Sequence, residues 1–266
     1  MLQPAAQKSK MSCLGIDVSS TVQGSELEHI TVEGIEATDA LGRAICQSQL
    51  TVRCEGVAPL NLDLKLSPDD LEPVFSGAAW AGTVLWRAAA VLVDRAFLGA
   101  DAVQIKGRTC IELGCGLGVP GMACARLGAK NVALTEQQSL VDLLTRNVAA
   151  NFSAGEDVRA VSFPWSRAGA EILKNDFCGG DPFDVIVCCD CVYVPLYGDS
   201  WKALLEAIDA LAGPATDVLI SLERRHVRDG DDGVDPFLEG MRANGFARTS
   251  YPAAMPVEVF RFRRGA

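Results

Sequence analysis

The sequence predicts a doubly wound α/β fold with a mostly parallel seven-stranded sheet, preceded by a small N-terminal β extension. Short apolar runs alternate with amphipathic helical stretches over residues 109–223, and a glycine-rich turn follows the first of these runs. Strands that alternate with helices are typical of a parallel sheet with helices on both faces. A glycine-rich turn after the first strand indicates a ligand site at the carboxyl edge of such a sheet.

The strands follow from runs of apolar or alternating residues. Three short runs in the N-terminal part predict a hairpin or small sheet, and the two last runs of the chain predict an antiparallel finish. The expected strands cover residues 29–35, 47–56, 60–66, 109–113, 131–136, 158–165, 183–190, 217–223, 245–251 and 257–264.

The helices follow from apolar residues at helical spacing and from their end signals. An apolar-rich helix over residues 83–99 is closed by Gly99, and Pro120 stands near the start of the helix after the glycine-rich turn. The other expected helices cover residues 121–129, 138–152, 200–213 and 236–245. The resulting division is a flexible tail over 1–25, a β extension over 26–78 and one α/β domain over 79–266.

Composition limits the classes of function. The chain has 266 residues, of which 49% are hydrophobic, so it can bury a large core. A formal net charge of -10 argues against a large nucleic-acid footprint and favours a basic protein surface as the partner. No apolar stretch approaches the roughly 18 residues of a membrane span. We expect no membrane association, no signal peptide and a location in the cytoplasm or the nucleus.

Cysteine usage also indicates a reducing compartment. Several of the ten cysteines stand in apolar runs such as VIVCCDCVY, where a free cysteine acts as a small hydrophobic residue. Cys188 and Cys191 form a lone CxxC pair, and the chain has two histidines. No second CxxC follows this pair, as the common four-ligand structural zinc sites would require, so we expect no metal.

The glycine-rich turn reads ELGCGLG over residues 112–118. Residues 116–121 match the dinucleotide pattern GxGxxG, but the preceding strand ends before Gly114. Counted from Gly114, the sixth position is Val119, and the pattern fails. Glu112 suits a cationic ligand group, such as the α-ammonium of S-adenosylmethionine (SAM), better than an anionic pyrophosphate. Glu136, at the end of the next strand, suits ribose hydroxyls of either cofactor.

Four features together resemble one protein family. They are AGTVLWRAA before the first core strand, IELGCGLGVPGMACARLGAKNVALTE, the Trp165 that follows the third core strand, and FDVIVCCDCVY. With these the chain resembles the class I, seven-β-strand SAM-dependent methyltransferases, from about residue 79 onward. Within that class it is similar to the protein-lysine methyltransferases, whose members modify elongation factors, Hsp70-type chaperones, calmodulin and valosin-containing protein.

The resemblance implies a set of site residues. The turn residues and Glu112 would hold the methionine end of SAM, Glu136 the ribose and Trp165 the adenine. Asp190 and Tyr193 match the Asp/Glu-x-x-Tyr/Phe motif beside the transferable methyl group and would be catalytic. The family often has an acidic residue where Pro164 stands, which puts the adenine-side contacts in doubt. The implied cofactor residues are Trp86, Glu112, Gly114, Cys115, Gly116, Glu136, Trp165 and Cys189.

The implied activity is methylation of a lysine side chain in a protein substrate, for instance a translation factor or a chaperone, by a monomer. Asp190 would attract the arriving ammonium, and Tyr193 would aim the amine at the methyl group. Three other functions stay open at this point. They are a small-molecule SAM-dependent methyltransferase, an NAD-dependent oxidoreductase and a non-catalytic binding module on the same fold.

Overall fold

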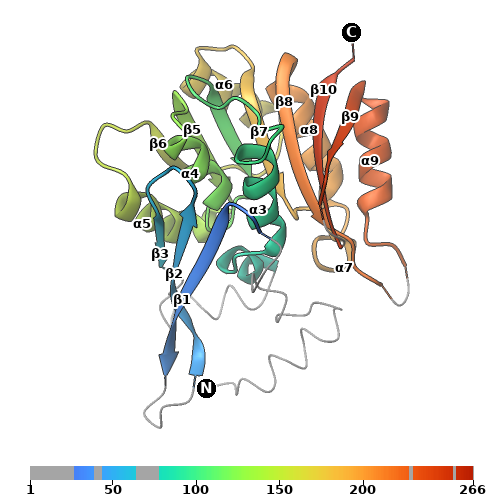
Figure 1. Ribbon diagram of the computed structural model, residues 1–266. Coiled ribbons are helices and arrows are strands. Elements are labelled where there is room, and N and C mark those ends of the chain that lie inside the picture. The colour runs from blue at the N-terminus through green and yellow to red at the C-terminus, as the bar shows by residue number, and fades with distance from the viewer. Residues whose placement is uncertain (1–26, 39–43, 64–77, 228–229, 254–255, 266) are drawn as a thin grey trace.

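The computed structural model describes residues 27–38, 44–63, 78–227, 230–253 and 256–265 (Figure 1). They form a three-stranded sheet of order β1-β2-β3 and a seven-stranded sheet of order β6-β5-β4-β7-β8-β10-β9. The expected tail over residues 1–25 lies outside the described residues.

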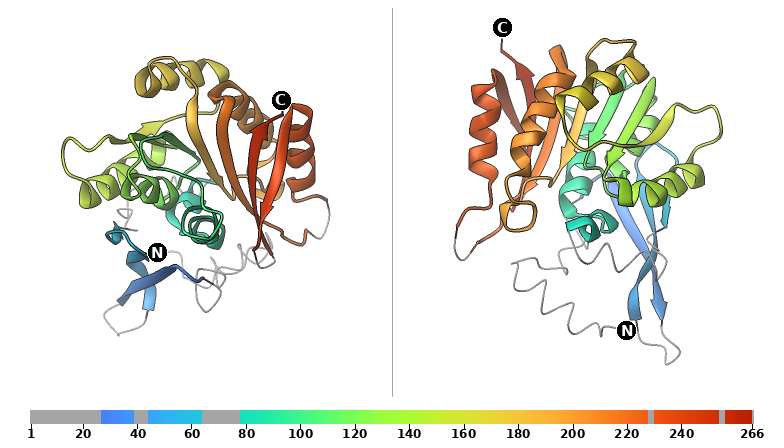
Figure 2. Two further views of the ribbon diagram at one scale, coloured as in Figure 1. Left: turned by 45° about the horizontal axis from the view of Figure 1, so that its top comes forward. Right: turned by 180° about the vertical axis from the view of Figure 1, so that it is seen from behind.

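The small sheet is antiparallel throughout and confirms the β extension. Its hairpin of β1 and β2 projects from the body of the molecule in both views of Figure 2. The boundary expected near residue 78 adjoins residues that are not described, so the division into domains stays a prediction. The three strands are β1 (Ile30–Thr38), β2 (Ala44–Cys54) and β3 (Leu60–Asp63).

The large sheet confirms the predicted fold class. Its first five strands are parallel, and β10 runs antiparallel between β8 and β9. The chain enters the sheet at β4, runs to one edge and crosses back to β7, which places a topological switch point between β4 and β7. The strands are β4 (Thr109–Leu113), β5 (Asn131–Glu136), β6 (Val158–Ser162), β7 (Phe183–Cys189), β8 (Ala212–Glu223), β9 (Phe246–Tyr251) and β10 (Val257–Arg264).

Helices cover both faces of this sheet (Figure 2). On β7, Val185 and Val187 join the core on one face while Ile186 and Cys188 join the core on the other, as the period of two requires. One face packs α3 (Arg87–Leu92), α4 (Val119–Arg126) and α5 (Val141–Asn151), and the other packs α6 (Arg167–Cys178), α8 (Ser200–Leu211) and α9 (Val234–Ala243). Shorter helical turns are η2 (Ala78–Thr83), η3 (Val93–Phe97), η4 (Gln138–Leu140) and α7 (Val194–Tyr197).

Two helical segments differ from the prediction. The expected helix over 83–99 begins only at Arg87, because Trp86 is extended with φ -78° and ψ 145°, and its last turn is a π-helix. Helix α6 was not expected at all. Its signals are local, because the Ser166 hydroxyl accepts the Gly169 N–H at 3.1 Å and Gly179 ends the helix with φ 65°.

Side-chain amides of α5 attach the extension to the domain. Asn147 accepts the N–H of Asp63 at 2.7 Å and donates to its carbonyl at 3.2 Å. One turn further on, Asn151 makes the same two bonds with Asn61, both at 2.7 Å. The two asparagines therefore give β3 the hydrogen bonds that a neighbouring strand would give.

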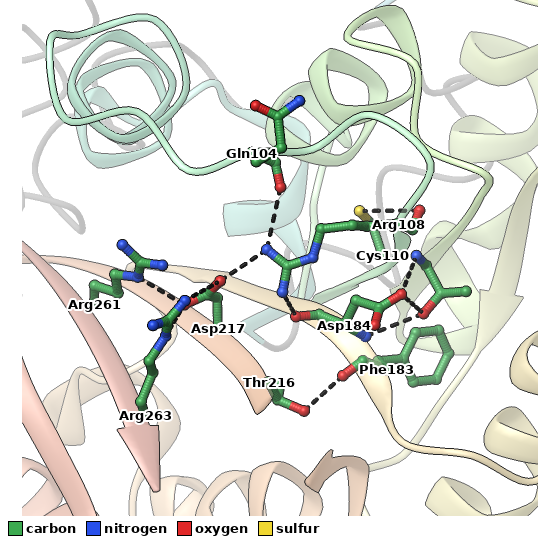
Figure 3. A network of polar contacts seen from close by, with 10 residues as sticks. Gln104, Arg108, Cys110, Phe183, Asp184, Thr216, Asp217, Arg261 and Arg263 are labelled. Carbon is green, nitrogen blue, oxygen red and sulfur yellow. Dashed lines mark hydrogen bonds and ion pairs between the residues drawn. The ribbon is translucent and has the colours of Figure 1, made fainter. Parts of the chain in front are cut away.

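A buried carboxylate connects strands at the amino edge of the parallel sheet (Figure 3). Asp217 is 0% exposed and pairs with Val185 of β7, just after a register shift between β7 and β8. It accepts hydrogen bonds from Arg108 Nη1 at 2.7 Å, Arg261 Nε at 2.6 Å and Arg263 Nε at 2.6 Å. Arg108 also donates to the carbonyl of Asp184 on β7, so this cluster links β4, β7, β8 and β10. Among the described residues, no helix has both the length and the apolar character of a membrane span.

Candidate cofactor and acceptor site

A cavity of about 390 Å³ lies at the carboxyl edge of the parallel strands, beside the switch point. Five segments line it: the residues before α3, the turn after β4, the end of β5, the segment after β6 and the residues after β7. Its size falls in the usual range of small-molecule sites. All eight predicted cofactor residues line it, namely Trp86, Glu112, Gly114, Cys115, Gly116, Glu136, Trp165 and Cys189.

Two positions of the turn after β4 require glycine. Gly114 and Gly116 have φ of 59° and 52°, in the left-handed region. A Cβ on Gly116 would stand 3.1 Å from the Gly82 carbonyl oxygen, and one on Gly114 would stand 2.8 Å from Cys191 Sγ. The two glycines therefore let the turn pack closely against Gly82 and Cys191 while it lines the cavity.

Glu112 is a buried acid at the end of β4. It is 1% exposed, and its Oε2 accepts the N–H of Gly121 at 2.7 Å. Burial raises the pKa of Glu112 to about 8, because the Gly121 hydrogen bond offsets only part of the cost of desolvation and the negative charge of Glu136 adds to it. A carboxyl group in this state gains from a cationic partner, which fits the α-ammonium of SAM.

Glu136 is the second buried acid, at the end of β5. Its two oxygens accept the N–H groups of Gly116 at 2.9 Å and Gln137 at 2.8 Å, which fixes its orientation. Burial nevertheless raises its pKa, since these two bonds only partly offset the desolvation. Neither acid offers a positive charge to a pyrophosphate, which argues against the NAD alternative, whereas ribose hydroxyls can donate to Glu136.

An aromatic wall completes the cofactor side. Phe163 is buried, and its N–H donates to the Glu136 carbonyl at 3.0 Å. Trp165 is half-buried, and its ring edge lies 3.1 Å from the position of a Cβ on Gly114. The wall thus stands beside the glycine-rich turn and Glu136. Acids for an ammonium and a ribose, and a flat apolar wall for adenine, fit SAM.

Asp190 reaches the cavity from β7 and has a strained backbone. Its φ of 54° is the one positive value at a non-glycine residue in the described part of the chain. Its N–H donates to the Ser221 carbonyl at 2.8 Å, and its Oδ1 accepts the Glu223 N–H at 3.1 Å. Asp190 is 7% exposed and lines the cavity, as predicted.

Asp190 already holds a cation that the sequence reasoning missed. The Arg225 guanidinium binds it through both Nη atoms, with Nη1 2.9 Å from Oδ1, and Nη2 also lies 3.4 Å from Glu223 Oε2. Burial alone would lower the pKa of Arg225, but the hydrogen bonds and charge of Asp190, with Glu223, raise it. The only sequence signal is the run ERR after β8, which reads as part of a charged loop.

Tyr193 differs from its expected place. It is 3% exposed, and its ring centroid lies 5.2 Å from Arg225 Cζ, but it is not among the residues that line the cavity. Tyr197 lines the cavity instead. It lies one helical turn after Tyr193, whose carbonyl accepts the Tyr197 N–H at 2.9 Å. Sequence reasoning missed Tyr197, although its i+4 spacing from Tyr193 was a possible signal.

The strand order and the acidic, glycine-lined cavity at the switch point define a class I SAM-dependent methyltransferase. The sequence profile described as lysine methyltransferase matches residues 70–238. The chain belongs to the lysine methyltransferase family. This confirms the resemblance, the fold class, SAM as the cofactor and the methyltransferase function predicted from the sequence.

Individual relatives agree with the family. The chain is 32% identical over 181 residues to protein N-lysine methyltransferase METTL21A of Danio rerio, covering 67% of this chain and 75% of the relative. It is 27% identical over 141 residues to EEF1A lysine methyltransferase 3 of Xenopus tropicalis, covering 53% and 57%.

Another relative carries a different kind of name. The chain is 43% identical over 131 residues to secreted RxLR effector protein 48 of Plasmopara viticola, covering 46% of this chain and 64% of that protein. The chain thus spans just under two thirds of this relative and three quarters of the Danio rerio protein. Among solved structures, a TehB-like SAM-dependent methyltransferase from Corynebacterium glutamicum is 20% identical, with a TM-score of 0.46 and coverage of 74% and 97%.

Proposed function

We propose that this protein transfers the methyl group of SAM to a lysine side chain of another protein. The observation that carries the proposal is the position of Asp190, which lines the cofactor cavity and at the same time binds a cation. A lysine acceptor arrives as a cation, whereas most small-molecule acceptors do not. Two relatives, protein N-lysine methyltransferase METTL21A and EEF1A lysine methyltransferase 3, support the same acceptor by their names.

Each group at the acceptor end has a task in this reaction. Bound SAM supplies a methyl group made electrophilic by its positively charged sulfur. The lysine amine must lose a proton before it attacks, since its ordinary pKa is about 10.4. Asp190 stabilises the arriving ammonium and holds it while the proton leaves to water. Tyr197, which lines the cavity, and Tyr193, whose ring packs against Arg225, position the amine and exclude water.

The partner is proposed from charge and from the relatives. The acidic chain favours a basic surface on the substrate, and a translation factor or a chaperone would provide one. The β1–β2 hairpin projects on the side of the molecule where α7 follows the carboxyl end of β7, so it could contact such a substrate (Figures 1 and 2). We further propose a monomer in the cytoplasm or the nucleus, which the free thiols of the eight described cysteines support.

The test uses the full chain with labelled SAM and a cell extract, followed by mass spectrometry of labelled proteins. We expect label on a protein lysine. Asp190→Asn should lower the rate at least about tenfold, equivalent to about 1.4 kcal/mol of transition-state stabilisation, because it removes the charge that holds the ammonium. Its affinity for SAM should change much less.

The matched control is Asp199→Asn, an exposed acid just before α8 that pairs only with Lys202 among the described contacts and does not line the cavity. It should leave the rate unchanged. Label confined to small molecules, or full activity of Asp190→Asn on a protein, would contradict the proposal. The small-molecule alternative would then take its place.

A further inference from the structure

The Arg225 guanidinium lies in a cage of two carboxylates and two aromatic rings. The carboxylates belong to Asp190 and Glu223. The ring centroids of Trp86 and Tyr193 lie 5.5 Å and 5.2 Å from Arg225 Cζ, within the range of cation–π attraction. The arginine side chain is 8% exposed and that of Asp190 4%, so these contacts are made largely away from water.

The chemistry of this cage is not specific to arginine. Aromatic faces combined with carboxylates bind ammonium and methylated ammonium groups, as aromatic cages for methyl-lysine do. Two members of the cage, Trp86 and Asp190, also line the cofactor cavity. A cation held in this cage therefore borders directly on the place of the methyl donor.

We propose that Arg225 is the resting occupant of the acceptor site and that the substrate lysine binds by exchange with it. The inference rests on the proposed function for the identity of the incoming cation. Exchange of one cation for another keeps Asp190 and Glu223 paired throughout. Departure of Arg225 without a replacement would leave buried negative charge uncompensated, which is strongly destabilising.

The neighbouring arginine is held in a different way and shows which part of the loop must move. Arg224 Nε lies 2.6 Å from Glu258 Oε2 on β10, and its Nη2 lies 2.7 Å from Asp235 Oδ1 on α9. These side-chain bonds hold Arg224, at the end of β8, against β10 and α9. Exchange therefore requires the Arg225 side chain to swing out, while the end of β8 stays in place.

An internal occupant would also determine specificity. A tethered side chain competes with any incoming cation at an effective concentration of the order of millimolar. Free amines and isolated lysine would seldom overcome this competition. A lysine presented by a protein gains further contacts outside the cage and can displace Arg225, so the exchange selects protein acceptors over small ones.

The experiment measures binding of butylammonium chloride, which mimics the end of a lysine side chain, to the full chain saturated with S-adenosylhomocysteine. Melting temperature is followed against matched sodium chloride. In Arg225→Ala the vacated cage should bind butylammonium at least about tenfold more tightly than the wild-type cage does. Arg225→Lys keeps a cation in the cage and should behave like wild type. Arg224→Ala, the matched control, should also behave like wild type.

Arg225→Gln provides a second variant, because it removes the charge but keeps a hydrogen-bond donor beside Asp190. It should show the same gain of butylammonium affinity if Arg225→Ala folds poorly. Equal affinity of wild type, Arg225→Ala and Arg225→Gln, or a gain in Arg224→Ala as well, would show that Arg225 does not compete for the cage and would overturn the proposal. Binding by Arg225→Ala with no binding by wild type at any concentration would also overturn it, because Arg225 would then be a fixed clamp on Asp190. No methyl transfer is needed for this readout, so it can fail or succeed independently of the proposed function.

Discussion

Two buried acids at opposite edges of the same sheet have opposite electrostatics. Glu112, at the carboxyl edge, and Asp217, at the amino edge, are 1% and 0% exposed. Burial raises the pKa of Glu112 to about 8. Burial acts in the same direction on Asp217, but three arginines outweigh it and hold the pKa of Asp217 well below its ordinary value (Figure 3).

Two acids of equal burial therefore differ in their cationic partners, and this difference distinguishes the structural acid from the acid in the cofactor cavity. The guanidiniums around Asp217 compensate its charge fully, and the cluster joins strands from distant parts of the chain. Glu112 has the backbone N–H of Gly121 as its hydrogen-bond donor and a second acid, Glu136, nearby. The ionised form of Glu112 therefore has no compensating cation among the described residues, at the edge where a cationic cofactor binds.

The largest effect that tests this comparison is expected at the amino edge. Asp217→Asn should lower the free energy of unfolding by about 3 kcal/mol, because it leaves three guanidiniums without their shared carboxylate. SAM affinity of the folded protein should stay the same. Denaturant titration and calorimetry measure the two quantities. Asp199→Asn, which breaks an exposed pair, should cost less than about 1 kcal/mol.

If Asp217→Asn lowered the free energy of SAM binding as much as the free energy of unfolding, the two edges of the sheet would be energetically coupled. The assignment of Asp217 to a purely structural role would then be wrong.

The second effect concerns the aromatic wall at the carboxyl edge. Trp165→Ala should weaken SAM binding by about 1–3 kcal/mol, on the scale of stacking between a base and an aromatic side chain. Trp201 is the matched control, since it packs against the same core but does not line the cavity. Trp201→Ala should lower stability and leave the SAM affinity of the folded protein unchanged. Equal losses of SAM affinity in both variants would assign Trp165 to the core alone.

The third effect is a pH dependence that should have opposite signs at the two edges. The pKa of Glu112 rises from 4.5 to about 8 on folding, so its contribution to stability is complete below pH 4.5 and is lost as pH rises toward 8. Asp217, with a lowered pKa, contributes stability above 3.8 that is lost as pH falls. Between these two pKa values of Glu112, the free energy of unfolding of wild type should fall by up to about 1.4 kcal/mol per pH unit. Glu112→Gln should remove this fall.

Unfolding of the protein without cofactor, measured from pH 5 to about pH 8, checks this sign. Glu112→Gln should be more stable than wild type at the upper end of the range and should bind SAM more weakly. A variant with the same pH slope as wild type would show that Glu112 is already ionised in the folded protein.

Much of the fold could be predicted because its signals are local. The runs TCIEL and NVALTE coincide with β4 and β5, since a buried parallel strand is a short apolar run with a defined end. The same property located Glu112, Glu136 and Asp190, because the carboxyl ends of parallel strands meet at one edge of a sheet. Helix α6 was missed although its signals, Ser166 and Gly179, are equally local.

Only the tertiary structure decided which charged and polar groups pair with each other. Asp190 and Arg225 are 35 residues apart, and the bonds of Asn147 to Asp63 span 84 residues. Such pairs depend on how separate loops come together around a core, and no periodicity in the chain encodes them. By itself the sequence determined the sheet, its glycine-rich turn and the acids at its carboxyl edge. The tertiary structure brings Arg225, in the loop after β8, next to Asp190, at the end of β7. The two side chains pair because a buried carboxylate needs a compensating partner.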